Sequence, residues 1–253
     1  MSMNLGDIYD HVDKTLNPDF VLIYEEGPEG LLRSVSAESF RKQTNNLARA
    51  LLEAGCHPGD KVAIYMRNRI EYLIATIALL KARLVHVNVN FRYKADELKY
   101  LLDNSDSKCV IFESRFAERL DAIRTDLATT DLFVQVSDED SCDSWAQDYQ
   151  NMVRSGDGVP LDVERSSDDM FFLYTGGTTG MPKGVMWNQA VLWKMIGGNP
   201  SNPTAPAPRS LQELPLKPEG GSGATLALLP FMHGAGVWSS LTALAYGDPV
   251  VVV

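Results

Sequence analysis

A loop of glycines and threonines followed by one lysine is the stretch of this 253-residue chain best suited to chemistry. It reads YTGGTTGMPKGV and spans 174–185. Its glycines can take positive φ and turn successive backbone N–H groups toward an anion without side-chain obstruction. Its threonine hydroxyls and the lysine ammonium add donors that suit the oxygens of a polyphosphate. The candidate phosphate-binding residues are Thr175, Gly176, Gly177, Thr178, Thr179, Gly180 and Lys183.

Three known phosphate-binding patterns do not match this loop. A Walker A loop requires G-x-x-x-x-G-K-[ST], but neither Gly180 nor Lys183 is followed by the required residue. A dinucleotide fingerprint and a kinase glycine loop both require G-x-G-x-x-G, whereas Gly176 and Gly177 are adjacent. A ligand-free turn that links two strands stays open as well, because glycine-rich turns are common. The composition favours phosphate binding over this empty turn.

A second segment of interest surrounds His233 and reads LLPFMHGAGVW over 228–238. A lone histidine is more often structural than functional, and the residues alone leave both uses open. Gly234, Ala235 and Gly236 would leave space beside it for an extended ligand. Trp238 suits a core or a pocket wall equally well. The other histidines have no partner pattern and are interpreted as structural: His11, His57 and His86.

The charge balance and the cysteines exclude several classes of protein. With 23 Lys+Arg and 33 Asp+Glu the net charge is −10, which argues against a general affinity for nucleic acid or anionic membranes. No secretory signal and no bilayer-length apolar run is recognisable. Three cysteines without a CxxC pair argue against a disulfide framework or a zinc site and fit a reducing cytoplasm. The acidic runs 25–26, 138–140 and 168–169 and the basic residues Arg67, Arg69, Arg83, Arg92 and Lys94 are interpreted as surface charge.

Helix-like and strand-like segments alternate along the first half of the chain with short connections. Apolar residues at helical spacing predict helices, and short apolar runs beside turn formers predict buried strands. This alternation is typical of right-handed βαβ units, so the predicted fold class is α/β with doubly wound, mostly parallel sheets and flanking helices. The predicted helices are 37–54, 69–81, 94–102 and 115–127, and the predicted strands are 61–65, 84–89, 108–112 and 132–136.

The second half of the chain alternates less regularly and contains a segment rich in proline and glycine. The segment 198–223 carries six prolines and four glycines, so it is predicted to be an exposed, mobile loop. The final PVVVV suits a strand covered on both faces. Because chain termini usually lie at the surface, we expect this chain to be the front part of a longer protein. Further predictions are helices near 145–153, 188–196 and 236–246, and strands at 170–175, 225–229 and 249–253, of which 225–229 is expected to be buried.

The loop at 174–185 closely resembles the signature loop of the adenylate-forming superfamily, which includes acyl-CoA synthetases, luciferases and peptide-synthetase adenylation domains. That pattern reads roughly [YF]-T-[SGT]-G-T-T-G-x-P-K-G-V, and every fixed position is met. The 228–238 segment resembles the family's next motif, and 55–112 resembles its amino-terminal subdomain. The segments MPKGVMW and MHGAGVW resemble the corresponding sequences of fatty acyl-CoA synthetases of the actinobacterial type.

The resemblance implies ATP-dependent activation of a carboxylic acid, foremost a fatty acid, to an acyl-adenylate, and transfer to CoA with release of AMP and pyrophosphate. In the family this loop holds the β- and γ-phosphates, so Lys183 would assist pyrophosphate departure. Mg²⁺ would bridge phosphate oxygens, with Thr175 or Thr178 as candidate ligands. ATP, Mg²⁺, CoA and a small carboxylic acid are thus the implied ligands, while a homo-oligomer stays open. The implied acyl or carboxylate pocket consists of His233, Gly234, Ala235 and Trp238.

The resemblance also implies that residues 1–253 are the front part of an AMP-binding domain built from two linked subdomains. Further family elements would lie beyond Val253, namely a second nucleotide loop, a ribose-binding Asp and a small domain with a catalytic lysine. The chain alone is therefore expected to bind nucleotide weakly and to turn over little. Two alternatives stay open: an acyl-AMP ligase or adenylation domain that loads a carrier protein, and a truncated, non-catalytic binding module.

Overall fold

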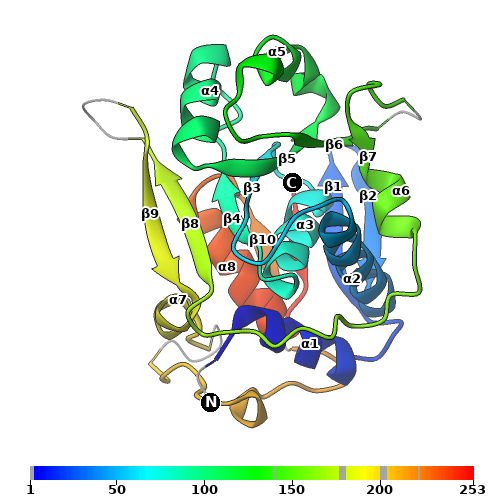
Figure 1. The fold of residues 1–253 in the computed structure, drawn as a ribbon. Coiled ribbons are helices and arrows are strands. Elements are labelled where there is room, and N and C mark those ends of the chain that lie inside the picture. Colours follow the sequence, from blue (N-terminus) through cyan, green and yellow to red (C-terminus); the bar gives the residue numbers. More distant parts are fainter. Residues whose placement is uncertain (1–2, 139–140, 177–180, 200–203, 222) are drawn as a thin grey trace.

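The computed structural model describes residues 3–138, 141–176, 181–199, 204–221 and 223–253. Two β-sheets are arranged with a layer of helices between them (Figure 1). The strands are β1 (Val21–Gly27), β2 (Gly30–Ser36), β3 (Lys61–Tyr65), β4 (Val85–Asn88), β5 (Ser107–Glu113), β6 (Leu132–Val136), β7 (Gln147–Asp148), β8 (Met170–Thr175), β9 (Lys183–Asn188), β10 (Thr225–Ala227) and β11 (Val250–Val252). The α-helices are α1 (Leu5–Thr15), α2 (Ala37–Glu53), α3 (Ile70–Lys81), α4 (Ala95–Asn104), α5 (Ala117–Asp121), α6 (Tyr149–Arg154), α7 (Gln189–Ile196) and α8 (Gly234–Ala245), and short 3-10 helices are η1 (Ser114–Phe116), η2 (Arg124–Asp126) and η3 (Leu211–Glu213).

The larger sheet has the strand order β7-β6-β5-β3-β4-β8-β9, and all its pairings are parallel except that of β8 with β9. Its central strand β3 alternates between two cores. Val62 and Ile64 join the core shared with α2 and α3, whereas Ala63 and Tyr65 join the core beneath α4 and α5. Helices therefore cover both faces of this sheet, which confirms the predicted doubly wound α/β class.

The helix α3 explains how the two sheets are joined. All twelve of its residues are buried, because α1, α2, β1 and α8 contact it on different sides. A helix that is apolar all round belongs in the interior of a protein. In Figure 1 it lies near the centre of the molecule, between the two sheets.

The smaller sheet has the order β10-β11-β1-β2. The strand β11 runs parallel to both of its neighbours, with Val250 beside Ile23 of β1 and Thr225 of β10. Val250 and Val252 are fully buried. The strand predicted for 249–253 is therefore confirmed as Val250–Val252, but only one of its faces is fully covered, since Val251 is half-buried and Val253 is exposed.

The first 36 residues hold elements that the sequence analysis did not predict: α1 and the hairpin β1–β2. Asn4 caps α1, since its Oδ1 accepts the Gly6 N–H at 2.7 Å. The hydrophobic face of α1, with Ile8, Tyr9 and Val12, is buried in the core. Leu5, Ile8, Tyr9 and Val12 follow helical spacing, so the signal for this helix was present in the sequence, beside the acidic residues Asp7, Asp10 and Asp13.

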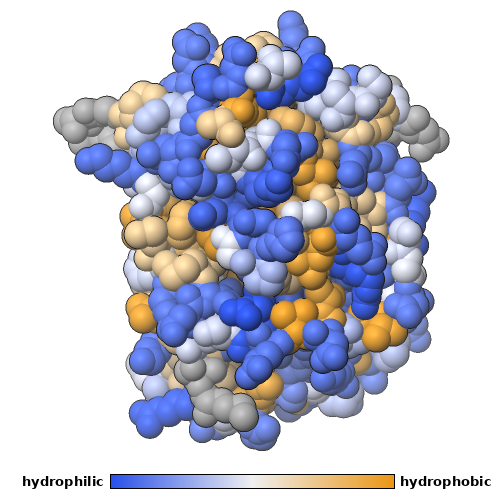
Figure 2. Space-filling model, viewed as in Figure 1, coloured by the Kyte–Doolittle hydropathy of each residue, from blue (hydrophilic) through white to orange (hydrophobic). Residues whose placement is uncertain are grey.

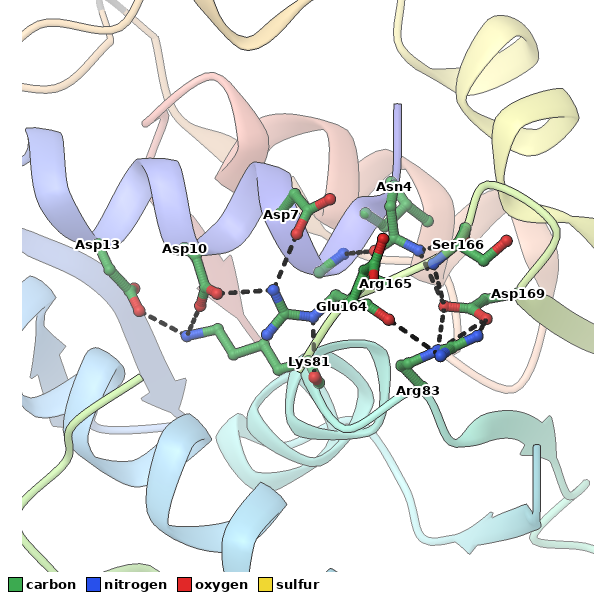
Figure 3. Close-up of polar contacts among 12 residues, drawn as sticks. Asn4, Asp7, Asp10, Asp13, Lys81, Arg83, Glu164, Arg165, Ser166 and Asp169 are labelled. Carbon is green, nitrogen blue, oxygen red and sulfur yellow. Dashed lines mark hydrogen bonds and ion pairs between the residues drawn. The ribbon is translucent and has the colours of Figure 1, made fainter. Parts of the chain in front are cut away.

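Those acidic residues belong to a buried ionic cluster, which joins α1 to the end of α3 and to the segment before β8 (Figure 3). The Lys81 ammonium is fully buried and pairs with Asp10 and Asp13. Arg165 binds Asp10 at 2.8 Å and Asp7 at 2.9 Å.

Beside this cluster, Arg83 pairs with Asp169 at 2.9 Å. The surface interpretation is therefore wrong for Asp169 and Arg83, whose side chains lock the start of β8. It is also wrong for Arg69, which is buried between Glu71 and Asp138. Burial alone would raise the pKa of Glu71, but hydrogen bonds from Arg33 and Arg69 lower it to about 2.

Two predicted helices differ from the observed elements. The predicted helix 115–127 is broken into η1, α5 and η2, although Phe116, Leu120 and Ile123 are buried at helical spacing. The helix predicted near 145–153 starts only at Tyr149. The residues before it form β7, which pairs with β6.

The prediction of a buried strand at 225–229 is wrong. The observed strand β10 is short and lies at the sheet edge, and Leu226, Leu228 and Leu229 are exposed by 53%, 69% and 54%. The loop prediction for 198–223 holds only in part. The described part of that segment contains η3, and Leu214 is buried against the main core.

The surface carries apolar residues among many polar ones, and hydrophilic residues cover most of the face in Figure 2. Among the described residues, no helix combines the length and the apolar character needed to cross a bilayer.

Candidate active site

The loop of glycines and threonines joins the antiparallel strands β8 and β9. Their register runs from Met170 beside Asn188 to Thr175 beside Lys183. The structure therefore brings Thr175 and Lys183 face to face at the base of the loop, and both are exposed. Because β8 is parallel to β4, the loop lies at the carboxyl edge of the larger sheet, where α/β proteins bind their ligands.

This strand–loop–strand arrangement differs from a Walker A or dinucleotide loop, each of which opens a helix. The empty-turn alternative was right in placing the loop between two strands. Four predicted phosphate-binding residues lie outside the described residues: Gly177, Thr178, Thr179 and Gly180.

The two described ends of the loop each carry a glycine, Gly176 and Gly184, in different surroundings. A Cβ at Gly176 would meet no atom of the described residues within 4 Å. A Cβ at Gly184 would lie 2.7 Å from the Tyr174 ring, so glycine is required there. Tyr174 is itself fixed, since its hydroxyl donates to Asn104 at 2.9 Å. Burial raises the pKa of Tyr174 to about 12, and its phenol therefore stays neutral.

The charge available at the loop comes from Lys183. Among the residues that the structure describes, its ammonium has no ion pair and no hydrogen-bond acceptor, and the side chain is exposed. The described residues also contain no group of three or more His, Cys, Asp or Glu that could hold a metal.

The predicted pocket segment forms the start of α8. His233 is the residue before the helix; it is exposed, and its side chain makes no capping hydrogen bond. Ala235 is also exposed. The expectation that the glycines leave space is wrong, because both are tightly surrounded. A Cβ on Gly234 would lie 2.8 Å from Leu173, and one on Gly236 would lie 2.4 Å from the Pro230 carbonyl oxygen.

Trp238 links α8 to the β8–β9 hairpin. Its ring meets the Trp187 ring of β9 edge to face, with centroids 5.4 Å apart and an interplanar angle of 83°. Both side chains are half-buried, and both indole N–H groups are buried without a partner among the described residues. Trp238 thus packs between β9 and α8. It is neither fully buried like a core residue nor fully exposed like an open pocket wall.

Two asparagines that the sequence analysis missed hold these segments together. Asn88, at the end of β4, accepts the Tyr174 N–H at 2.6 Å and donates to the Tyr174 carbonyl at 2.8 Å and the Met232 carbonyl at 2.6 Å. Asn68, beyond β3, accepts the Phe231 N–H at 2.7 Å and donates to the Leu229 carbonyl at 3.0 Å. A polar residue at the end of an apolar strand, as in VHVN, was the available signal.

His86 confirms the structural interpretation of that histidine. It is fully buried on β4, stacks on Phe171 with centroids 4.2 Å apart, and its Nε2 lies 3.2 Å from the Tyr72 hydroxyl. Burial lowers the pKa of His86 to about 4, so the ring is neutral near pH 7.

Comparison with known proteins places this geometry in a family. Residues 14–253 match the family model described as AMP-binding enzyme. The chain is 34% identical, over its whole length, to 3-oxocholest-4-en-26-oate–CoA ligase from Rhodococcus rhodochrous, of which it covers 45%. It is 32% identical to medium/long-chain-fatty-acid–CoA/3-oxocholest-4-en-26-oate–CoA ligase from Mycobacterium tuberculosis, of which it covers 46%. The chain therefore spans about half the length of the curated relatives that it matches.

Solved structures show the same fold. The N-terminal domain of FACL13 from Mycobacterium tuberculosis superposes with a TM-score of 0.77 at 24% identity, covering 98% of this chain and 56% of that one. A long-chain-fatty-acid–CoA ligase from Archaeoglobus fulgidus superposes with a TM-score of 0.78 at 19% identity, covering 100% of this chain and 47% of that one. With the family model matched from residue 14 to residue 253, this chain belongs to the AMP-binding enzyme family.

Proposed function

We propose that this chain is the front part of an ATP-dependent carboxylate–CoA ligase and supplies its phosphate-binding loop and part of its acid-binding wall. The observation that carries the proposal is the placement of Thr175 and Lys183 opposite each other at an exposed loop base. Asn88 ties that base to the segment that ends at His233. An anion site and a candidate acid site thus share one edge of the sheet.

In the proposed reaction a carboxylate oxygen attacks the α-phosphorus of ATP, the bond to the bridging oxygen breaks, and pyrophosphate leaves with that electron pair. The carboxylate and the triphosphate repel each other, so donors must neutralise the phosphates and hold the reactants in line. Thr175, the loop amides and Lys183 would bind the departing phosphates. Mg²⁺ bound with ATP would neutralise further phosphate charge.

A thiol then attacks the acyl carbonyl, and AMP leaves to give a thioester. CoA is the proposed thiol, because the relatives named above are CoA ligases. The acids in the names of these relatives, medium- to long-chain fatty acids and a sterol-derived acid, support a large apolar acid for this chain as well. The free cysteines Cys56, Cys109 and Cys142 support a reducing, cytoplasmic location.

A second candidate is an enzyme that loads its acyl group onto a carrier protein. It is favoured by 29% identity over 177 residues to gramicidin S synthase 2 from Brevibacillus brevis, lower than the identity to the CoA ligases. A non-catalytic binding module is the third candidate.

One experiment separates the three. The complete protein that carries this chain is given ATP and a panel of fatty and sterol-derived acids, and pyrophosphate–ATP exchange is measured with and without CoA. A CoA ligase should exchange pyrophosphate with a long-chain acid and form acyl-CoA when CoA is added. Exchange without any CoA thioester favours the carrier-loading enzyme. The absence of exchange with every acid contradicts the proposed function.

A further inference from the structure

The junction between β4 and β8 is unusually poor in backbone pairing. The two strands share one registered residue pair, Val87 with Phe172. Side chains of β4 add further contacts, since His86 Nδ1 lies 3.3 Å from the Phe172 carbonyl oxygen and Asn88 binds Tyr174. The strand that leads into the phosphate loop is therefore tied to β4 by side-chain hydrogen bonds as well as by the backbone.

Asn88 takes the place of a strand backbone at this junction. A primary amide has one acceptor oxygen and two N–H donors, and its oxygen and one N–H reproduce the acceptor and donor of a peptide group. These two groups bind the N–H and the carbonyl of Tyr174. The remaining N–H binds the Met232 carbonyl, so every N–H of this buried side chain is used.

The two partners of Asn88 are the residues immediately before the two candidate sites. Tyr174 precedes Thr175, where the phosphate loop begins, and Met232 precedes His233. One rigid amide thus fixes the phosphate loop and the acid-binding segment relative to each other.

Asn68 provides a contrast within the same fold. Its side chain binds the Ala227, Leu229 and Phe231 main chain, and so it holds the segment before His233. None of its hydrogen bonds reaches β8. Asn68 therefore anchors one site, whereas Asn88 joins two.

We propose that Asn88 is a positioning residue for acyl-adenylate formation, which sets the carboxylate against the α-phosphorus by fixing the distance between the phosphate loop and the His233 segment. The inference rests on the proposed function. Reacting atoms must approach to roughly 3–3.5 Å, and a misplacement of about 1 Å can cost on the order of a hundredfold in rate. A residue that spaces the two sites acts mainly on kcat.

The kinetic test uses the complete protein with three substitutions. Asn88→Ala should lower kcat for pyrophosphate–ATP exchange by about 10- to 100-fold while the KM values for ATP and acid change less. Asn68→Ala should change mainly the KM for the acid. Asn90→Ala is the matched control, because the Asn90 side chain only accepts the nearby Arg92 N–H, at 3.0 Å, and it should stay within about twofold of wild type.

Hydrogen–deuterium exchange of the same variants gives a readout that does not depend on activity. Asn88→Ala should speed exchange in peptides covering both 170–176 and 228–236, and Asn68→Ala should affect 228–236 alone. Peptides from β3 should be unchanged in both. This pattern shows whether one side chain couples the two segments.

The outcomes separate the inference from the proposed function. If wild type makes no acyl-adenylate, the proposed function fails, while paired exchange changes in Asn88→Ala still support the coupling of the two segments. If wild type is active but Asn88→Ala keeps its kcat, or if exchange rises throughout the sheet, Asn88 is a general structural residue and the inference is overturned.

Discussion

Two lysines in this molecule are placed in opposite ways. Lys81 is fully buried at the end of α3, pairs with Asp10 and Asp13, and donates to the Thr44 and Asn45 side chains at 2.9 Å. Lys183 is exposed at the base of the phosphate loop and, within the described part of the chain, has no partner. Lys81 thus has a structural role, whereas Lys183 is available for the phosphate ligand proposed above. Burial and pairing distinguish these two charges.

The largest expected effect is on the buried side of this comparison. Lys81→Met should destabilise the protein by about 3–5 kcal/mol, because it leaves buried carboxylates without their cation. The free energy of unfolding from urea titration measures this loss. The matched control is Lys99→Met, which breaks the partly exposed pair with Asp103 and should cost about 1 kcal/mol or less. Equal losses in the two variants would remove the distinction between the lysines.

The pH dependence of stability tests a second buried group, the neutral His86. His86 has a pKa of about 4 in the folded protein against 6.5 for an ordinary histidine, so the unfolded chain binds a proton between these values and the folded protein does not. Stability should therefore fall by about 3 kcal/mol as the pH drops from roughly 6.5 to 4, and this contribution is fully present above pH 6.5. Urea midpoints across this range measure it. A flat profile in wild type would contradict a buried neutral His86.

The smallest effect on stability, with a clear effect on activity, is expected at the exposed lysine. Lys183→Ala removes a charge-assisted contact worth about 1.5–3 kcal/mol, so pyrophosphate–ATP exchange should fall roughly tenfold or more. Unfolding should change by less than about 0.5 kcal/mol, because no described partner is lost. Lys194→Ala, on α7, is the control and should retain exchange. Wild-type exchange in Lys183→Ala would show that the loop does not use this cation.

The parts of the fold that the sequence revealed are those governed by local periodicity. Alternating apolar segments from 37 to 136 were enough to predict the doubly wound sheet, and the loop at 174–185 was recognisable by its residues. The prediction missed α1, although its apolar residues follow helical spacing. The sequence could not reveal that Asp10 and Asp13, beside this face, pair with Lys81 about 70 positions away, because that pairing depends on the tertiary fold.

The candidate site shows the same limit. Thr175, Lys183 and His233 were named from their own sequence context, and the structure brings their segments to one edge of the sheet. Asn68 and Asn88 were missed because their hydrogen bonds join positions that lie far apart in the sequence. Similarly, the glycines at 234 and 236 were expected to open space, but only packing reveals that Leu173 and Pro230 fill it.

The pairing of β1 with β11 has a consequence for biosynthesis. It joins Ile23 to Val250, so the smaller sheet cannot be completed until the ribosome has passed Val250. At about 5–20 residues per second, roughly 10–50 seconds pass between synthesis of the two strands. During this interval β1 has β2 on one side and an open edge on the other, which is a template for pairing with foreign strands. We therefore expect the nascent hairpin β1–β2 to be the part of the chain that depends most on chaperones.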